Sequence, residues 1–406
     1  MAYFFQNGLV LTKSAAGACP LLCRWLVELC TRVAGMTLWD DNANTKWSAT
    51  LVGGSGTLGR SVAGQPAQFD TTLDGTYTFT SANVGNYLTL TGMTPTNRNG
   101  IYRISKVISN RVVELDIKFG VHEDGIPPSS AGVSWRLWDT SSTCVPALSD
   151  WCVIRGTYPT GGNWDLRIDV NTQDYNPPKF TMGPFATWNN SSHAWSDSRN
   201  MTQWTVDSSA DFGNNGVQLN MFACTDTNRI VAFMGKKSTT GQTTYLWYIG
   251  AFSSFYSASD PAPAIVWAGG TGNPGPQDPE IGACANNNVI RNSARWLAKD
   301  DLTTLQCFLE LPDRNYADGL GVGLRSYYVR RWSAYSRKIY RQEIMVSYPY
   351  ISWMERRGIL IDFWAISHLY TRLMPFGTSR EYISMPWGFA MPWNGSKVHV
   401  QPTGSN

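Results

Sequence analysis

The sequence predicts a mainly β fold, in which small antiparallel β barrel or sandwich modules form two or more domains, with one N-terminal amphipathic helix. Short runs of β-branched and aromatic residues alternate with Gly, Asn and Pro along most of the chain, as in strands joined by turns. The chain has 406 residues, which is too long for one compact core. Hydrophobic residues make up 43% and charged residues 16%, a composition that favours folding over disorder.

Residues 20–34 carry the one convincing helical pattern. Cys19 can cap this helix, Pro20 suits its first turn, and Gly35 ends it. At about 100° per residue the apolar side chains fall in one stripe, although Leu21 and Trp25 lie towards the polar side, so the helix is expected to be covered on two sides. The stripe contains Cys19, Leu22, Cys23, Leu26, Cys30 and Val33, and the polar side contains Arg24, Glu28, Thr31 and Arg32.

The three helix cysteines are expected to be core or interface residues, because Cys19, Cys23 and Cys30 share the apolar stripe. The alternative is a disulfide to another chain, formed after the protein leaves a reducing compartment.

Residues 36–140, after an N-terminal arm and helix at 1–35, predict a small antiparallel β module. Its polar, turn-rich segment 138–149 is the expected linker to the next domain. Natural turns lie at Asn99-Gly100 and at Ser109-Asn110. The expected strands are 76–80, 87–91, 100–107 and 111–117.

Residues 150–406 predict a larger β-rich domain. Asp226 and Asn228 lie in an expected hairpin turn before an apolar run, and residues 269–282 are rich in Gly and Pro, as in a surface loop. The expected strands are 151–155, 164–170, 217–223, 230–235 and 244–253.

Charge and cysteine usage exclude several classes of partner. The net charge of +3 comes from scattered basic residues, so nucleic acid is not an expected partner. The apolar stretch near the N-terminus is interrupted by Arg24, Glu28 and Arg32, so neither a membrane span nor a signal peptide is expected. Eight cysteines without a CxxC pair fit synthesis in a reducing cytoplasm.

No motif predicts catalysis or a cofactor. Residues 54–59 match the dinucleotide pattern GxGxxG, but Gly64 and Pro66 follow where the motif needs a helix, so the match is interpreted as accidental. The four histidines have no metal-ligand spacing, and no nucleophile motif is present. Carboxylates available for glycoside hydrolysis are interpreted as scattered solvated acids, and include Asp165, Asp169, Asp174, Glu310, Asp313 and Glu355.

Tryptophans form the candidate binding residues. Trp188, Trp195 and Trp204 are interleaved with Asn189, Asn190 and His193, a mixture that suits either a protein interface or a sugar-binding face. Interface or core is the preferred interpretation, because tryptophan is a common interface anchor. The C-terminal region around Trp387 and Trp393 is the second candidate interface.

Several stretches resemble structural proteins of tailed-bacteriophage virions. Residues 77–116 include YTFTSANVGNYLTLTG, NRNGIYRISKV and VVELD, which are similar to a small β module of such particles. Residues 222–250 include IVAFMG and YLWYIGAF, followed by Asp260-Pro261, and resemble a second pattern of these proteins. The stretches ERRGILIDFWAISH and PFGTSREYISMPWG, at 355–368 and 375–388, resemble their closing segments.

The resemblance implies a structural role in the tail, baseplate or neck. It implies other virion proteins as partners, a homo-oligomer within the particle, synthesis in the host cytoplasm, and no catalytic residues. Two alternatives stay open: a receptor- or glycan-binding tail protein, and a polysaccharide-degrading tail enzyme.

Overall fold

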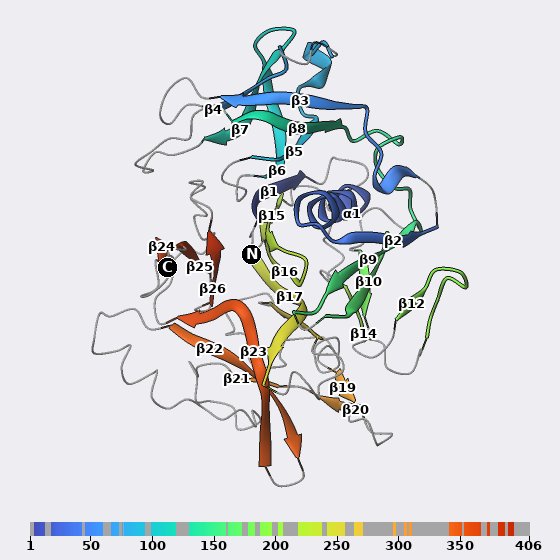
Figure 1. The fold of residues 1–406 in the computed structure, drawn as a ribbon, viewed down its shortest axis with the longest axis vertical. Coiled ribbons are helices and arrows are strands. Elements are labelled where there is room, and N and C mark those ends of the chain that lie inside the picture. Colours follow the sequence, from blue (N-terminus) through green and yellow to red (C-terminus); the bar gives the residue numbers. More distant parts are fainter. Residues whose placement is uncertain are drawn as a thin grey trace.

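The structure is a computed structural model of the chain (Figure 1). It describes residues 4–12, 18–42, 45–59, 66–72, 75, 77–93, 99–118, 130–159, 161–172, 178–182, 187–196, 202–205, 218–237, 242–255, 264–270, 295–297, 304–306, 308–310, 341–350, 353–366, 372–373, 381–385 and 389–393. Only the backbone is described at 4–12, 45, 117–118, 130–131, 202–205, 218–225, 231–247, 254 and beyond 255.

The predicted mainly β fold with one N-terminal helix is confirmed. Strands account for 49% of the described residues, arranged in several antiparallel sheets. Helix α1 (Ala18–Glu28) continues into a wider π-helical turn, η1 (Leu29–Val33), and the chain leaves it at Gly35, where φ is +83°. A left-handed residue of this kind ends helices because glycine has no Cβ to clash.

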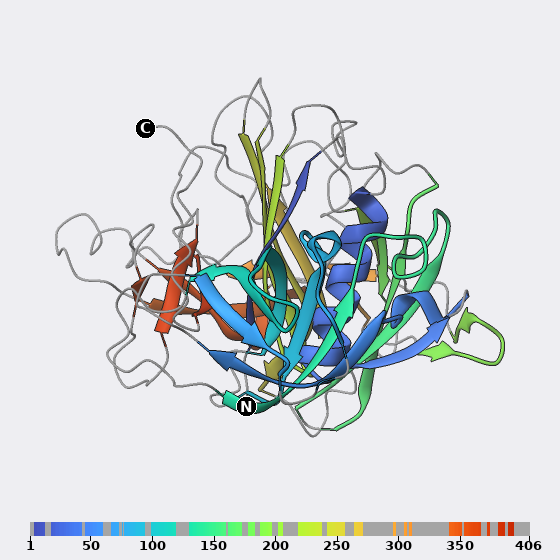
Figure 2. The ribbon, with the colours of Figure 1, turned by 90° about the horizontal axis from the view of Figure 1, so that it is seen from above.

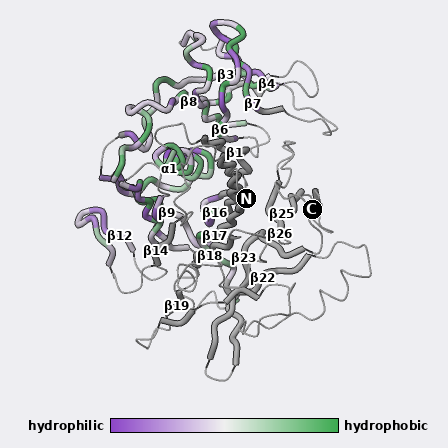
Figure 3. Tube along the Cα trace, turned by 180° about the vertical axis from the view of Figure 1, so that it is seen from behind, coloured by the Kyte–Doolittle hydropathy of each residue, from purple (hydrophilic) through white to green (hydrophobic). Residues whose placement is uncertain are grey.

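The polar side of the helix differs from the simple expectation of an outward face. Arg24 and Glu28 are both completely buried, like every other residue of α1. The helix is central in the molecule and packs on strands on several sides. Figure 2 shows it between the β15–β17 strands and the β9–β10 strands, and Figure 3 shows its largely hydrophobic colouring.

The predicted small β module is a closed six-stranded barrel. The strands follow the order β3-β4-β7-β6-β5-β8 around it, and the β6–β7 hairpin turns at Ser109 and Asn110 as expected. Leucine, valine and aromatic side chains fill the interior. The strands are β3 (Val52–Gly59), β4 (Pro66–Asp70), β5 (Tyr87–Thr91), β6 (Gly100–Val107), β7 (Val112–Lys118) and β8 (Ser130–Trp138).

The strand predicted at 76–80 is wrong. Residues 77–80 are not paired as a strand, and the short helix η3 (Ser81–Asn83) follows them. Instead Tyr77 and Phe79 turn inward, and each ring lies about 6 Å from the ring of Trp135 in the barrel core. The alternating aromatic pattern therefore reflects an internal plug of the barrel and not a ladder.

The GxGxxG pattern at 54–59 lies entirely within strand β3, in agreement with its interpretation as accidental. Its glycines have a packing role instead. A Cβ at Gly56 would lie 2.4 Å from the ring of Phe69, whose β4 strand pairs with β3.

A five-stranded sheet lies on the other side of the helix. Its order is β14-β11-β10-β9-β2, so β2 joins this sheet although its residues were expected in the barrel module. The expected linker at 138–149 is turn-rich, but Cys144 and Val145 are buried. The strands are β2 (Thr37–Asp41), β9 (Trp151–Thr157), β10 (Asn163–Asp169), β11 (Lys179–Met182) and β14 (Thr202–Thr205).

The largest sheet has eleven strands and unites both ends of the chain. β1 (Phe4–Thr12) pairs with β15 (Gln218–Thr225), and the path continues through β16 (Arg229–Lys237) and β17 (Gln242–Ser254) to the C-terminal strands. The others are β18 (Ala264–Gly270), β21 (Phe308–Glu310), β22 (Arg341–Tyr350), β23 (Trp353–Ile366), β24 (Arg372–Leu373), β25 (Glu381–Met385) and β26 (Phe389–Trp393). A separate pair joins β19 (Arg295–Leu297) to β20 (Thr304–Gln306).

One hydrophobic core joins these parts. It contains the helix side chains, the outer wall of the barrel, the inner face of the five-stranded sheet, and Ile230 and Ile249 of the large sheet. The β15–β16 turn also contacts β9 directly: the Thr157 N–H donates to Thr227 O at 2.7 Å, and Asn228 Nδ2 donates to Thr157 O at 2.9 Å. Among the described helices, none is long and apolar enough to span a membrane.

Candidate functional site

The two faces of the five-stranded sheet differ, and the outer face carries the candidate site. Side chains alternate along a strand. On β9 and β10 one set belongs to the core beside the helix, and includes Cys152, Ile154, Leu166 and Ile168. The other set includes Arg155, Asp165 and Arg167. In the register Asp165 lies opposite Arg155, and Arg167 opposite Val153.

An irregularity in β2 adds two functional side chains to this outer face. The register between β2 and β9 shifts between Leu38 and Asp40, as in a β-bulge. The guanidinium of Arg155 stacks over the ring of Trp39, 3.5 Å from its centroid. A bulge redirects side chains locally, so Trp39 and Asp40 both reach partners on the outer face.

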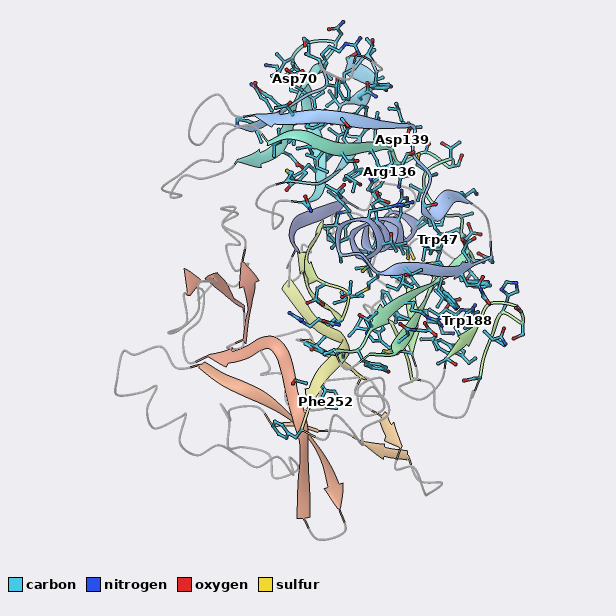
Figure 4. All side chains as sticks on the ribbon, in the orientation of Figure 1. Trp47, Asp70, Arg136, Asp139, Trp188 and Phe252 are labelled. Carbon is cyan, nitrogen blue, oxygen red and sulfur yellow. The ribbon has the colours of Figure 1, made fainter. Side chains whose placement is uncertain are left out.

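The short hairpin of β12 (Trp188–Asn189) and β13 (Ala194–Trp195) folds over the same face, with Trp188 paired to Trp195. Two carboxylates anchor Trp188: its backbone N–H donates to Asp165 Oδ2 at 2.8 Å, and its indole Nε1 donates to Asp40 Oδ2. Trp188 is only 3% exposed. Figure 4 shows its place between the hairpin and the sheet.

Asp165 is the central acceptor under this hairpin. Its side chain is fully buried and receives two bonds from Arg155, at 2.6 and 2.8 Å, in addition to the Trp188 N–H. A bidentate guanidinium–carboxylate pair has a fixed relative orientation. Asp165 therefore fixes both the guanidinium above Trp39 and the start of the hairpin.

Arg167 completes the cluster. Its guanidinium carbon lies 4.7 Å from the ring centroid of Trp151 and 5.3 Å from that of Trp188, within the range of cation–π attraction. Its Nη2 also lies 2.6 Å from Asp169 Oδ1, and this ion pair is partly exposed. We call Trp39, Trp151, Trp188, Trp195, Arg155 and Arg167 the tryptophan–arginine cluster.

The cluster is partly open to solvent. Trp39, Trp151 and Trp195 are half-buried, while the hairpin residues between the tryptophans are exposed. His193 at the turn has φ of +50°, and its Nδ1 lies 2.8 Å from Asp40 Oδ2. The hydrophilic hairpin turn is visible beside β12 in Figure 3.

The structure brings some of the predicted tryptophans together and not others. Trp188 and Trp195 pack with their ring centroids 5.2 Å apart. Trp204 lies in β14, where its backbone pairs with Phe180, outside the hairpin. Trp393 ends β26 opposite Glu381, described by its backbone, and Trp387 lies outside the described residues.

Cys19, Cys23 and Cys30 lie in the main core, and Cys152 of β9 is buried with them. All four are reduced thiols. Burial raises the pKa of the Cys23 thiol well above its ordinary value, and the neighbouring Cys19 and Cys152 raise it further. Such thiols are poor nucleophiles, because the thiolate is the reactive form.

Sequence reasoning missed Trp39, Asp40, Arg155 and Arg167. One signal was available: in Asp165-Leu-Arg167-Ile-Asp169 charged and apolar residues alternate with the period of a strand. That pattern predicts one charged face but not which aromatic rings lie on it. Of the acids considered for hydrolysis, Asp165 and Asp169 are ion-paired, Glu310 and Glu355 are described by backbone alone, and Asp174 and Asp313 lie outside the described residues.

Within the described part of the chain, no three His, Cys, Asp or Glu side chains meet in a way that suits a metal ion. Comparisons of the chain with protein families, with curated proteins and with solved structures give no match.

Proposed function

We propose that this chain is a structural subunit of a tailed-phage virion, in the tail, baseplate or neck, and that it binds neighbouring subunits without catalysis. The tryptophan–arginine cluster carries this proposal within the structure. Tryptophan and arginine are the residues most enriched at the energetic centres of protein interfaces. The phage assignment itself comes from the resemblance of residues 77–116 and the later stretches to virion proteins.

The geometry of the cluster supports binding. Its rings and guanidiniums are held by buried acceptors, above all Asp165. Side chains that are already ordered lose little conformational entropy when a partner arrives. Half-buried rings also keep apolar surface available for burial, worth about 25 cal/mol per Å² before the costs of association.

The virion assignment is tested on purified particles. Mass spectrometry of particles from the phage that encodes this chain should detect it at a fixed ratio to the other virion proteins. Its absence from intact particles would reject the virion part of the proposal.

The binding surface is tested by hydrogen exchange. Amides of the 187–196 hairpin should exchange at least tenfold more slowly in the particle than in the isolated chain, and Trp195→Ala should reduce incorporation. Phe255→Ala is the matched control, because Phe255 is 54% exposed and lies outside the cluster. Equal hairpin exchange in both states, with normal incorporation of Trp195→Ala, would show that this surface is not the interface.

Glycan binding is the second candidate function, favoured by one observation. The half-buried Trp195 shares a short hairpin with the exposed Asn189, Asn190 and His193, and such rings and polar groups match the faces and hydroxyls of sugars. Glycan-array binding that Trp195→Ala abolishes would favour this function over subunit binding. For the polysaccharide-degrading alternative, release of reducing sugars by the isolated chain is the deciding measurement.

A further inference from the structure

A charged seam joins helix α1 and turn η1 to the outside of the barrel. Arg24, Glu28 and Arg32 are spaced by four residues, which places them along one side of the helix. On the barrel, Thr89 of β5 pairs with Arg136 of β8. Their neighbours Leu88 and Leu137 belong to the barrel interior, so by alternation Thr89 and Arg136 lie on the outer wall.

The inner part of this seam is saturated with partners. Arg24 donates to Glu28 Oε2 at 2.6 Å, to Cys144 O at 3.0 Å and to Ala49 O at 2.9 Å. The second oxygen of Glu28, Oε1, accepts from the Thr89 hydroxyl at 2.7 Å. The one carboxylate of the seam is therefore fully used, and its charge is matched by Arg24.

Arg136 has no such partner. Its Nη1 atom is buried, and no group in the described part of the chain accepts a hydrogen bond from it. Figure 4 places this side chain between the barrel and the helix. A buried nitrogen of a charged group without an acceptor costs free energy, so a missing acceptor is the natural explanation.

Arg32 adds a second positive charge at the same place. It is exposed near the end of η1. Burial lowers the pKa of the Arg136 guanidinium, the nearby charge of Arg32 lowers it further, and Arg24 also lowers it, whereas Glu28 raises it. No salt bridge of the described residues includes Arg32 or Arg136. With Glu28 matched by Arg24, these two guanidiniums leave two positive charges without a counter-ion.

We propose that Arg32 and Arg136 bind one oxyanion at the rim of the helix–barrel seam. A guanidinium presents parallel N–H donors that fit a carboxylate, phosphate or sulfate group, and two guanidiniums facing one pocket of excess positive charge favour such a ligand. The bound oxyanion accepts the hydrogen bond of Arg136 Nη1 and removes the repulsion from Arg32. This site is independent of the tryptophan–arginine cluster and of the proposed function.

The experiment measures thermal unfolding of the full chain in phosphate, sulfate and acetate, each against chloride at equal ionic strength. Phosphate should raise the unfolding temperature by about 2 °C for each tenfold increase in concentration above its dissociation constant. A larger effect of phosphate and sulfate identifies a free tetrahedral anion as the ligand. An equal effect of acetate identifies a carboxylate, such as an acidic side chain of another subunit.

Two variants keep the proposal falsifiable. Arg136→Gln removes the buried donor, and Arg32→Gln changes only an exposed side chain, which should leave folding intact. Both should abolish the phosphate-dependent shift, whereas Lys106→Gln, which removes an exposed charge from barrel strand β6, should keep it. Calorimetric titration of phosphate into the wild-type chain should give one site. No phosphate effect on the wild type, or the same effect in Arg32→Gln as in the wild type, would overturn the proposal.

Discussion

Glu28 of the helix and Thr89 of the barrel form the bond on which their relative placement depends. The Thr89 hydroxyl donates to Glu28 Oε1 at 2.7 Å and at the same time accepts from Trp138 Nε1 at 3.0 Å. Both side chains are buried. A buried polar chain of this kind is stabilising only when every member has its partner, because each orphaned group keeps its desolvation cost.

Glu28→Gln should therefore destabilise the protein by about 3–5 kcal/mol, since it leaves the buried Arg24 without its counter-charge. Urea unfolding measures the change. The double variant Arg24→Met, Glu28→Leu should recover most of the loss, because it removes both charges together. A single variant as stable as the wild type would mean that the pair does not contribute as the geometry indicates.

Asp165→Asn should loosen the hairpin over the tryptophan–arginine cluster. The amide cannot accept both Arg155 bonds and the Trp188 N–H as the carboxylate does. A loss of about 2–4 kcal/mol follows from breaking this buried pair, with faster amide exchange at 187–196. Asp169→Asn is the matched control on the same strand, and should cost less than about 1 kcal/mol because its ion pair is partly exposed. Equal effects of the two changes would contradict the central role of Asp165.

Gly56→Ala should destabilise the barrel by about 1–3 kcal/mol through overpacking. The added Cβ would meet the Phe69 ring at 2.4 Å and Asp70 O at 2.8 Å. Gly59→Ala in the same strand has nothing within 4 Å of the added carbon, so it should be close to neutral. Thermal unfolding of the two variants, side by side, tests the packing explanation of this glycine-rich strand.

The buried thiols should make stability fall at high pH. The pKa values of Cys23 and Cys152 are raised, chiefly by burial, so the folded state keeps their protons when the unfolded chain has lost them. Their contribution is complete below the unfolded-state pKa of about 8.5 and is lost as pH rises above it. Urea unfolding between pH 7 and 10.5 should show this decline, and Cys23→Ala with Cys152→Ala should flatten it. Rapid labelling of both thiols in the native protein at pH 8 would contradict their burial.

The sequence by itself determined the β-rich class, the single helix and most strand positions. Glycine and asparagine turns separate alternating apolar runs, and these signals are local. Strand β5 at Tyr87–Thr91 and β6 at Gly100–Val107 have the predicted bounds for this reason. The cysteine stripe of the helix followed from its period in the same way, because position on a helix depends only on spacing.

The tertiary structure alone decided which surfaces those elements share. Residues 77–80 have a strand-like sequence, but the barrel uses their aromatic rings as a plug. Arg24 and Glu28 have the sequence signature of a solvated helix side, yet the barrel covers them and satisfies their charges. Trp39 and Trp188 are 149 residues apart and meet through a hydrogen bond and the shared outer face of one sheet. Such long-range pairings depend on strand order and on the bulge in β2, which no local pattern of residues encodes.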